Sequence, residues 1–172
     1  IKLIKLIQQE KIIHSRYDCE EDEYVLQVVP YVILFDQNKK VFSYVRARDK
    51  KDYGDTRLFG NHSIGLGGHI AITDGPNFIE NCIEREVTRE ETKITGSYGR
   101  PKLVGTFFAR DKPVDRVHFG LIYKMNFRGK VRSNEKSIVA YKMKTMDEVM
   151  NEKDKYETWS RVLIPHLPAL YG

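Results

Sequence analysis

Two glutamates occupy positions where an amphipathic helix would be apolar. The sequence predicts a helix that begins near Asn77, and Ile79 and Ile83 mark the face that it would bury. At about 100° per residue, Glu86 and Glu90 fall about 20° to either side of Ile79. Two carboxylates one turn apart on a buried face repel each other and lose hydration unless a cation lies between them. The pair therefore predicts a site for a divalent ion.

A glycine-rich turn, GLGGHI at residues 65–70, comes directly before this helix. Glycines allow the backbone to approach a ligand closely. Carboxylate and backbone oxygens together make a hard site that suits Mg²⁺ or Mn²⁺. The alternative is that both glutamates pair with the neighbouring Arg85 and Arg89 on a solvated face.

Gly68 and the run 85–90, REVTRE, resemble the Nudix box of the MutT-like hydrolases. That motif reads glycine, five residues, glutamate, seven residues, and then Arg-Glu-aliphatic-x-Glu-Glu-x-Gly. The segments GLGGHI, PVDRVHFGLIY and ETWSRVLIPHL resemble a bacterial Nudix subgroup of predicted phosphoesterases, and the resemblance spans residues 29–167. It implies an α/β fold, a Nudix-type α/β/α sandwich with a central mixed β-sheet. It also implies metal-dependent hydrolysis of a diphosphate linkage between a nucleoside diphosphate and another moiety.

The chain departs from this motif at several positions. Three more residues than usual separate Gly68 from Arg85, which fits an enlarged turn at residues 72–74. Asn77 stands where the motif has its first glutamate, Arg89 stands in place of the first of the paired glutamates, and residue 92 is threonine instead of glycine. Glu91 would lie about 120° from Ile79, so regular helix geometry predicts that it points away and that one metal ligand is missing.

The resemblance implies that Glu86, Glu90 and the Gly68 carbonyl hold Mg²⁺ or Mn²⁺, and that Arg85 orients a carboxylate of the motif. Glu86 is also the candidate for steering the attacking water, so the catalytic set is Glu86, Arg85 and Glu90. Arg89 could bind a phosphate or could instead neutralise the site.

Several further residues are candidates for contacting the substrate or a metal. The substrate-binding candidates are Arg46, Arg48 and His69 in addition to Arg89; the first two follow a predicted strand and could equally be surface arginines. Asp115 and Glu135 are weaker candidates for a metal ligand from a loop. We interpret His118 as a hydrogen-bonded strand histidine rather than a base.

The chain of 172 residues is long enough for one domain. We predict a single Nudix-like domain over 1–172, with an N-terminal appendage at 1–23 and a core at 24–172 that contains the box-like segment 68–92. Hydrophobic patterns predict strands at 24–35, 40–47, 63–70, 103–109, 117–127 and 137–143, and Pro30 should split the first strand or place it at an edge. Helices are predicted after a capping box at 145–148 and at 154–163. Loops are predicted at 20–23, 49–61 and 95–101. Residues 1–16 fit either a helix or an edge strand.

The net charge of +5 favours anionic partners, and a small nucleotide or diphosphate substrate fits it. Nucleic acid is a weaker alternative, because no stretch interleaves lysines with aromatic residues. No apolar run suits a membrane span or a signal peptide, which predicts a cytoplasmic location. Cys19 and Cys82 are expected to be reduced thiols. A homodimer is one option, and the main rival to an enzyme is a Nudix-fold nucleotide-binding or regulatory module that has lost catalysis.

Overall fold

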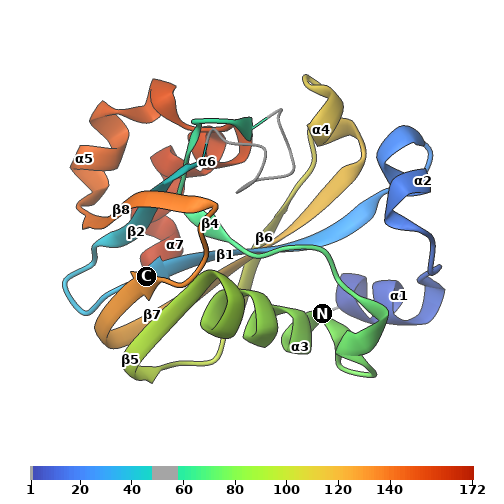
Figure 1. The fold of residues 1–172 in the computed structure, drawn as a ribbon, viewed down its shortest axis with the longest axis horizontal. Helices are drawn as coiled ribbons and strands as arrows, with labels where there is room; N and C mark the ends of the chain where they lie inside the picture. Colours follow the sequence, from blue (N-terminus) through green and yellow to red (C-terminus); the bar gives the residue numbers. More distant parts are fainter. Residues whose placement is uncertain (1, 48–57) are drawn as a thin grey trace.

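The computed structural model describes residues 2–47 and 58–172, which form a mixed β-sheet with helices on both faces (Figure 1). Short 3₁₀-helices and one π-helix, all labelled η, accompany the regular elements. In chain order the elements are α1 (Lys2–Glu10), α2 (Arg16–Glu21), β1 (Gln27–Phe35), β2 (Val41–Arg46), β3 (His62–Ser63), β4 (Gly65–Leu66), η2 (Ile72–Asp74), α3 (Phe78–Arg85), η3 (Glu86–Glu91), β5 (Thr92–Tyr98), β6 (Lys102–Phe107), α4 (Pro113–Arg116), β7 (His118–Ser133), β8 (Ile138–Lys144), α5 (Met146–Asn151), η4 (Lys153–Lys155), α6 (Thr158–Leu163), η5 (Ile164–His166) and α7 (Leu167–Tyr171).

The centre of the sheet is the parallel pair β1–β7, which runs in register from Gln27 opposite His118 to Phe35 opposite Asn126. All other pairs are antiparallel: β1 with β2 and β4, β2 with β3 and β8, and β7 with β5 and β6. The sheet is therefore mixed, as expected from the sequence.

The two faces of β1 explain why its sequence is almost continuously apolar. Val32 and Leu34 pack in one buried cluster with α3, whereas Ile33 and Phe35 pack in a second cluster with α5, α6 and α7. Successive side chains of a strand point to opposite faces, and a strand that is covered on both faces has no solvent-facing positions. Figure 1 shows the sheet between these two helical layers. The predicted α/β/α sandwich is confirmed.

Pro30 neither splits β1 nor places it at an edge, so that prediction was wrong. The Gln27 N–H donates to the Val117 carbonyl at 2.8 Å, and amides along a parallel strand alternate between neighbours. The nitrogen of Pro30 consequently faces away from β7, on the side where β4 has only two residues, Gly65 and Leu66. The N–H that proline lacks is thus at a position beyond the hydrogen bonds between β1 and β4.

Strand β5 replaces part of the loop predicted at 95–101. It pairs with β7 from Thr92 opposite Ser133 to Tyr98 opposite Phe127. Its residues are mostly exposed and polar, which is why no hydrophobic alternation revealed it. Gly96 and Gly129 lie opposite each other with φ of 125° and 121°, and each approaches the facing backbone too closely for a side chain.

Other local predictions needed smaller corrections. Residues 1–16 contain helix α1, and the acidic run 20–23, predicted as a loop, begins inside helix α2. The strand expected at 63–70 is reduced to β3 and β4. The predicted loop at 49–61 lies mostly outside the described residues.

Toward the C-terminal end, the predicted capping box of Thr145 and Glu148 forms both of its hydrogen bonds. The helix expected at 154–163 begins only at Thr158, and helical turns continue past Pro165 into α7. Cys19 and Cys82 are buried free thiols. Of the helices in the described residues, none has the length and apolar character needed to cross a bilayer.

Candidate active site

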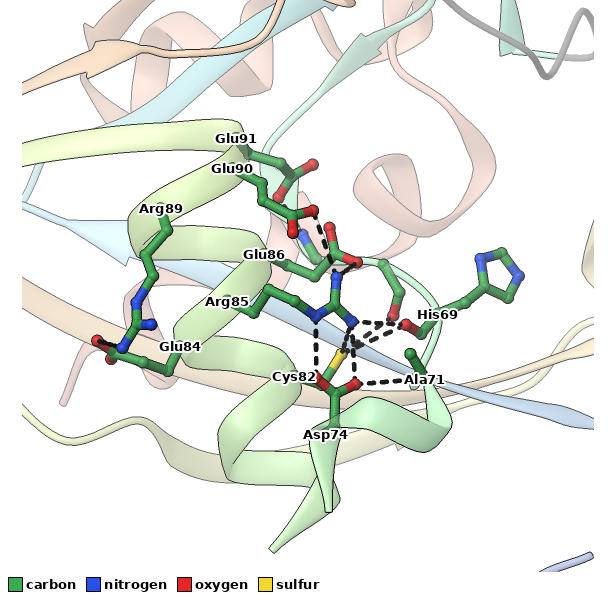
Figure 2. A network of polar contacts seen from close by, with 12 residues as sticks. His69, Ala71, Asp74, Cys82, Glu84, Arg85, Glu86, Arg89, Glu90 and Glu91 are labelled. Carbon is green, nitrogen blue, oxygen red and sulfur yellow. Dashed lines mark hydrogen bonds and ion pairs between the residues drawn. The ribbon is translucent and has the colours of Figure 1, made fainter. Parts of the chain in front are cut away.

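Arg85, the last residue of α3, organises the polar groups in front of that helix (Figure 2). Its Nε and Nη2 atoms donate to the two carboxylate oxygens of Asp74, both at 2.9 Å. Asp74 ends the 3₁₀-turn η2, which forms the predicted enlarged turn, and its side chain also accepts from the Ala71 N–H at 2.7 Å. Hydrogen bonds from Arg85 lower the pKa of Asp74, so this bidentate pair is fully charged near neutral pH.

The third nitrogen of Arg85 contacts two glutamates of the following turn. Nη1 lies 2.5 Å from Glu86 Oε1 and 3.3 Å from Glu90 Oε2. The structure thus brings Arg85, Glu86 and Glu90 together, as the sequence suggested. Glu90 lies at the rim, where 53% of its side chain is exposed, compared with 16% for Glu86.

The segment Glu86–Glu91 is a π-helix, and this wider turn decides which side chains face inward. Residues five apart are stacked in a π-helix, as residues four apart are in an α-helix. Val87 and Thr92 are accordingly both fully buried, and the Thr92 hydroxyl donates to the Val87 carbonyl at 2.5 Å. Glu91 follows Glu86 by five residues and faces the same side (Figure 2). The expectation that Glu91 points away was wrong, because it assumed regular α-helical spacing.

Glu91 is the most deeply buried of the three glutamates, with 6% of its surface exposed. Its Oε2 accepts from the Gly67 N–H at 2.5 Å, which fixes the carboxylate against the glycine-rich turn. Burial raises the pKa of Glu91 well above its ordinary value, and the nearby Glu86 raises it further. Burial likewise raises the pKa of Glu86, with the Arg85 contact acting in the opposite direction. Burial therefore disfavours the charged form of both carboxylates in the chain without metal.

Gly68 lies directly against the Glu86 carboxylate, so any side chain at this position would displace that carboxylate. A Cβ atom at this position would be 2.5 Å from Glu86 Cδ and Oε1. The glycine-rich turn and the carboxylates of Glu86 and Glu91 line one cavity, of about 1790 Å³. Glu135, considered only as a weak candidate, lines the same cavity and contributes to the raised pKa of Glu86 and Glu91.

The group of charges fits a divalent cation. Arg85 bonds to three carboxylates, and Asp74 already engages two of its nitrogens. Glu91 adds a fourth carboxylate, and Arg46 is the other cation that acts on it. Oxygen ligands of this kind suit Mg²⁺ or Mn²⁺. The alternative, in which arginines alone neutralise the acids, applies only in part, because Arg85 bonds to Glu86 and Glu90 while Glu91 is held by a backbone amide.

The predicted substrate-binding residues have different surroundings. Arg46 lines the cavity but donates from Nε to Glu157 Oε2 at 2.9 Å. Arg89 lies on the opposite side of the helix from the carboxylates, with 71% of its side chain exposed and 3.5 Å from Glu84 (Figure 2). His69 lines the cavity, and its ring points away from Arg85 (Figure 2). Arg48 lies outside the described residues.

Sequence reasoning missed Asp74 and set Glu91 aside. A carboxylate within the enlarged turn was a usable signal for Asp74, because an arginine on a nearby helix needs a partner. For Glu91 the signal was the spacing from Glu86 to the acidic pair Glu90–Glu91, which is one residue longer than in the Nudix box. A π-turn accommodates one extra residue. Asp115 is buried and lines the same cavity, where it accepts from Trp159 Nε1 at 2.9 Å.

Comparison with known proteins supports this arrangement at the level of the fold. The chain is 26% identical over 157 residues to protein YmaB of Bacillus subtilis, an alignment that spans 87% of the chain and 74% of YmaB. No protein-family model matches the chain. The crystal structure of Tm1382, itself a proposed Nudix hydrolase, superposes with a TM-score of 0.76 at 24% identity, covering 98% of this chain and 84% of Tm1382.

Two further crystal structures match with lower scores. The MutT protein of Methanosarcina mazei Go1 has a TM-score of 0.58 at 12% identity, over 84% of this chain and 94% of its own. DR0079 of Deinococcus radiodurans has a TM-score of 0.60 at 13% identity, over 93% and 94%. The chain therefore has the Nudix fold.

The fold and the π-turn together explain the irregular motif. When one residue of the pair Thr88–Arg89 is counted as an insertion, Arg85 and Glu86 are followed by the acidic pair Glu90–Glu91 at the spacing of the Nudix box. The π-helix places the extra residue on the outer side and keeps the acidic pair on the inner side (Figure 2).

Proposed function

We propose that this protein is a hydrolase that cleaves a diphosphate linkage in a nucleotide-like substrate with the help of Mg²⁺ or Mn²⁺. The observation that carries the proposal is the convergence of Glu86, Glu90 and Glu91 beside the backbone of Gly68. The Nudix fold and the box-like segment support it. The cavity lined by Gly68, Glu86 and Glu91 has room for a nucleotide-sized ligand.

Glu86 and Glu91 would hold the metal, with Glu90 and the Gly68 carbonyl as further ligands. Such an ion supplies positive charge that stabilises the phosphoryl oxygens as negative charge develops on them. Arg85 keeps Glu86 in place and is itself fixed by Asp74, so the carboxylates need little reorganisation when the substrate binds.

Glu86 is the candidate for accepting a proton from the attacking water. Burial raises the pKa of Glu86 in the chain without metal, and a bound cation would lower it. Arg46 remains a candidate for a phosphate contact, because it lines the same cavity and its charge lowers the pKa of Glu91. In this proposal Arg89 has no catalytic role, since it faces away.

The rival function is a nucleotide-binding module that has lost catalysis. Two features motivated it, Arg89 in place of a glutamate and Asn77 in place of another. The geometry weakens both reasons, because Glu91 provides a further carboxylate and Asp74 provides the partner of Arg85. A cytoplasmic location, a homodimer, and the division into an N-terminal appendage and a core stay predictions.

A hydrolysis screen separates the enzyme from the binding module. Purified protein is incubated with nucleoside diphosphate sugars, dinucleoside polyphosphates and nucleoside triphosphates, each with Mg²⁺, with Mn²⁺ and with a chelator. The enzyme should release a nucleotide product from at least one class only when metal is present. Tight nucleotide binding without turnover of any class would favour the binding module instead. Binding to oligonucleotides that weakens steeply with salt would point to nucleic acid.

A further inference from the structure

Three side chains far apart in the sequence direct ligand atoms at one point beside the glutamate site. They are Glu20 of α2, His69 just after β4, and His118 at the start of β7. The two Nε2 atoms of the histidines are 2.9 Å apart, and Glu20 Oε1 is 3.8 Å from that of His69 and 4.0 Å from that of His118. We propose that this cluster binds a transition-metal ion, with Zn²⁺ as the ion best suited to it.

The distances are close to those of a zinc site. Nitrogen and oxygen ligands lie about 2.0–2.2 Å from tetrahedral Zn²⁺, so two ligand atoms are about 3.3 Å apart. The histidine pair is slightly closer than this and the carboxylate is slightly farther. Movements of less than about 1 Å, of Glu20 toward the histidines and of the two rings away from each other, would complete the three-ligand set.

The orientation of His118 is that of a metal ligand. Its Nδ1 lies 2.6 Å from the Val114 carbonyl, so Nδ1 carries a proton and donates it, and the lone pair of Nε2 faces the cluster. Histidines that bind metals almost always donate their other ring N–H in this way, which fixes the ring. His118 is also buried, with 7% exposed, so this orientation is held by packing as well.

The ligand types distinguish this cluster from the glutamate site. Two imidazoles and one carboxylate favour zinc and its neighbours among the transition metals, whereas sites made only of oxygen favour Mg²⁺ and Mn²⁺. The two sites use separate side chains, since the ring of His69 points away from Arg85 (Figure 2). Three protein ligands leave a coordination position free, and all three of these residues line the cavity. The ion would also attach α2, from the N-terminal segment, to the core of the fold.

A cobalt titration of the full chain without a polyhistidine tag tests this proposal. Co²⁺ substitutes for Zn²⁺ and gives visible absorption bands when it is bound by imidazole and carboxylate in a tetrahedral site. With excess Mg²⁺ present to fill the glutamate site, the wild-type protein should bind one Co²⁺ per chain, which Zn²⁺ displaces. His69→Ala and His118→Ala should each weaken binding by more than about tenfold, and Glu20→Gln should weaken it less.

Matched controls are available on the same chain. His166→Ala and Glu21→Gln alter exposed residues of the same types and should bind Co²⁺ like the wild type. Glu91→Gln should also keep the Co²⁺ bands, because it belongs to the other site. The measurement does not depend on hydrolytic activity, so it stands or fails separately from the proposed enzyme function.

Two results would overturn the proposal: a wild-type protein that shows no cobalt bands at saturation, or His69→Ala binding as tightly as the wild type. Because His118 is buried, circular dichroism is recorded first for His118→Ala. If that variant does not fold, the partly exposed His69 provides the same test. Loss of the bands in Glu91→Gln alone would instead assign the cobalt to the glutamate site.

Discussion

Replacing Glu91 by glutamine tests the role of the π-turn most directly. Glutamine has nearly the same shape, and its side-chain oxygen can still accept from the Gly67 N–H, so the turn is preserved while one negative charge is removed. Glu91 is 6% exposed and fixed, whereas the side chain of Glu90 is 53% exposed. Glu91→Gln should therefore impair the metal site more than Glu90→Gln does.

The expected size follows from linkage between metal binding and unfolding. A ligand at about one hundred times its Kd stabilises the folded state by about 2.7 kcal/mol. For a domain of this length 1 kcal/mol shifts Tm by about 2–4 °C, so saturating Mg²⁺ or Mn²⁺ should raise the wild-type Tm by about 5–10 °C. At the same metal concentration Glu91→Gln should lose most of that rise, and its rate of hydrolysis should fall by about 10²–10³-fold.

Without metal, the same substitution should raise the stability of the folded state instead of lowering it. Because burial raises the pKa of Glu91, the neutral carboxyl stabilises the folded state below the unfolded pKa of about 4.3, and that contribution is lost as the pH rises through the folded pKa. Glutamine does not ionise, so Glu91→Gln does not lose this stability. Without metal, the free energy of unfolding should therefore fall less in the variant than in the wild type as the pH rises.

Differential scanning fluorimetry with and without metal, across a pH series, measures these effects. Glu84→Gln, on the outer side of the same helix, serves as the control and should behave like the wild type. The reasoning would be refuted if Glu91→Gln kept both the full metal-induced rise in Tm and the wild-type rate.

Four further variants concern the glycine-rich turn and Arg89. Gly68→Ala should abolish metal-dependent turnover with little change in Tm, because the added methyl meets only the movable end of the Glu86 side chain. Gly67 has a φ of 134°, and a methyl there would overlap the Pro30 carbonyl. Gly67→Ala should therefore lower the free energy of unfolding by about 1–3 kcal/mol or more in chemical denaturation. Arg89→Glu should leave metal affinity within about twofold in isothermal titration calorimetry, since the side chain is exposed on the far side; a large gain would instead mean that Arg89 displaces a ligand. Deletion of Arg89 should convert the π-turn to α-helix and keep turnover, whereas a dead but folded deletion variant would contradict the insertion hypothesis.

The sequence alone determined much of the architecture. Apolar runs identified the central strands, because a strand buried on both faces has little choice of residue type. The glycine-rich turn, Arg85, Glu86 and Glu90 were recognisable because their chemistry needs these residue types close together along the chain. The capping box at Thr145 was correct for the same reason, since both of its hydrogen bonds join residues three apart.

Only the tertiary structure decided which carboxylates complete the site. Regular helix geometry predicts that Glu91 points outward. In the structure, however, β5 begins at Thr92, and the hydroxyl of Thr92 donates to the carbonyl of the buried Val87. Burying both residues, five apart, requires the wider π-turn, which brings Glu91 inward. That constraint comes from the pairing of β5 with β7, far along the chain, and local periodicity does not contain it.

The same holds for the partners that the sequence left unconnected. Asp74 meets Arg85 because an enlarged turn folds back onto the end of α3, and Glu20, His69 and His118 meet because α2 packs where the glycine-rich turn passes the start of β7. Individually these residues carried weak signals, since an isolated histidine or acid is most often a surface or structural residue. Their chemistry exists only in combination, and the combination is set by long-range packing of the sheet.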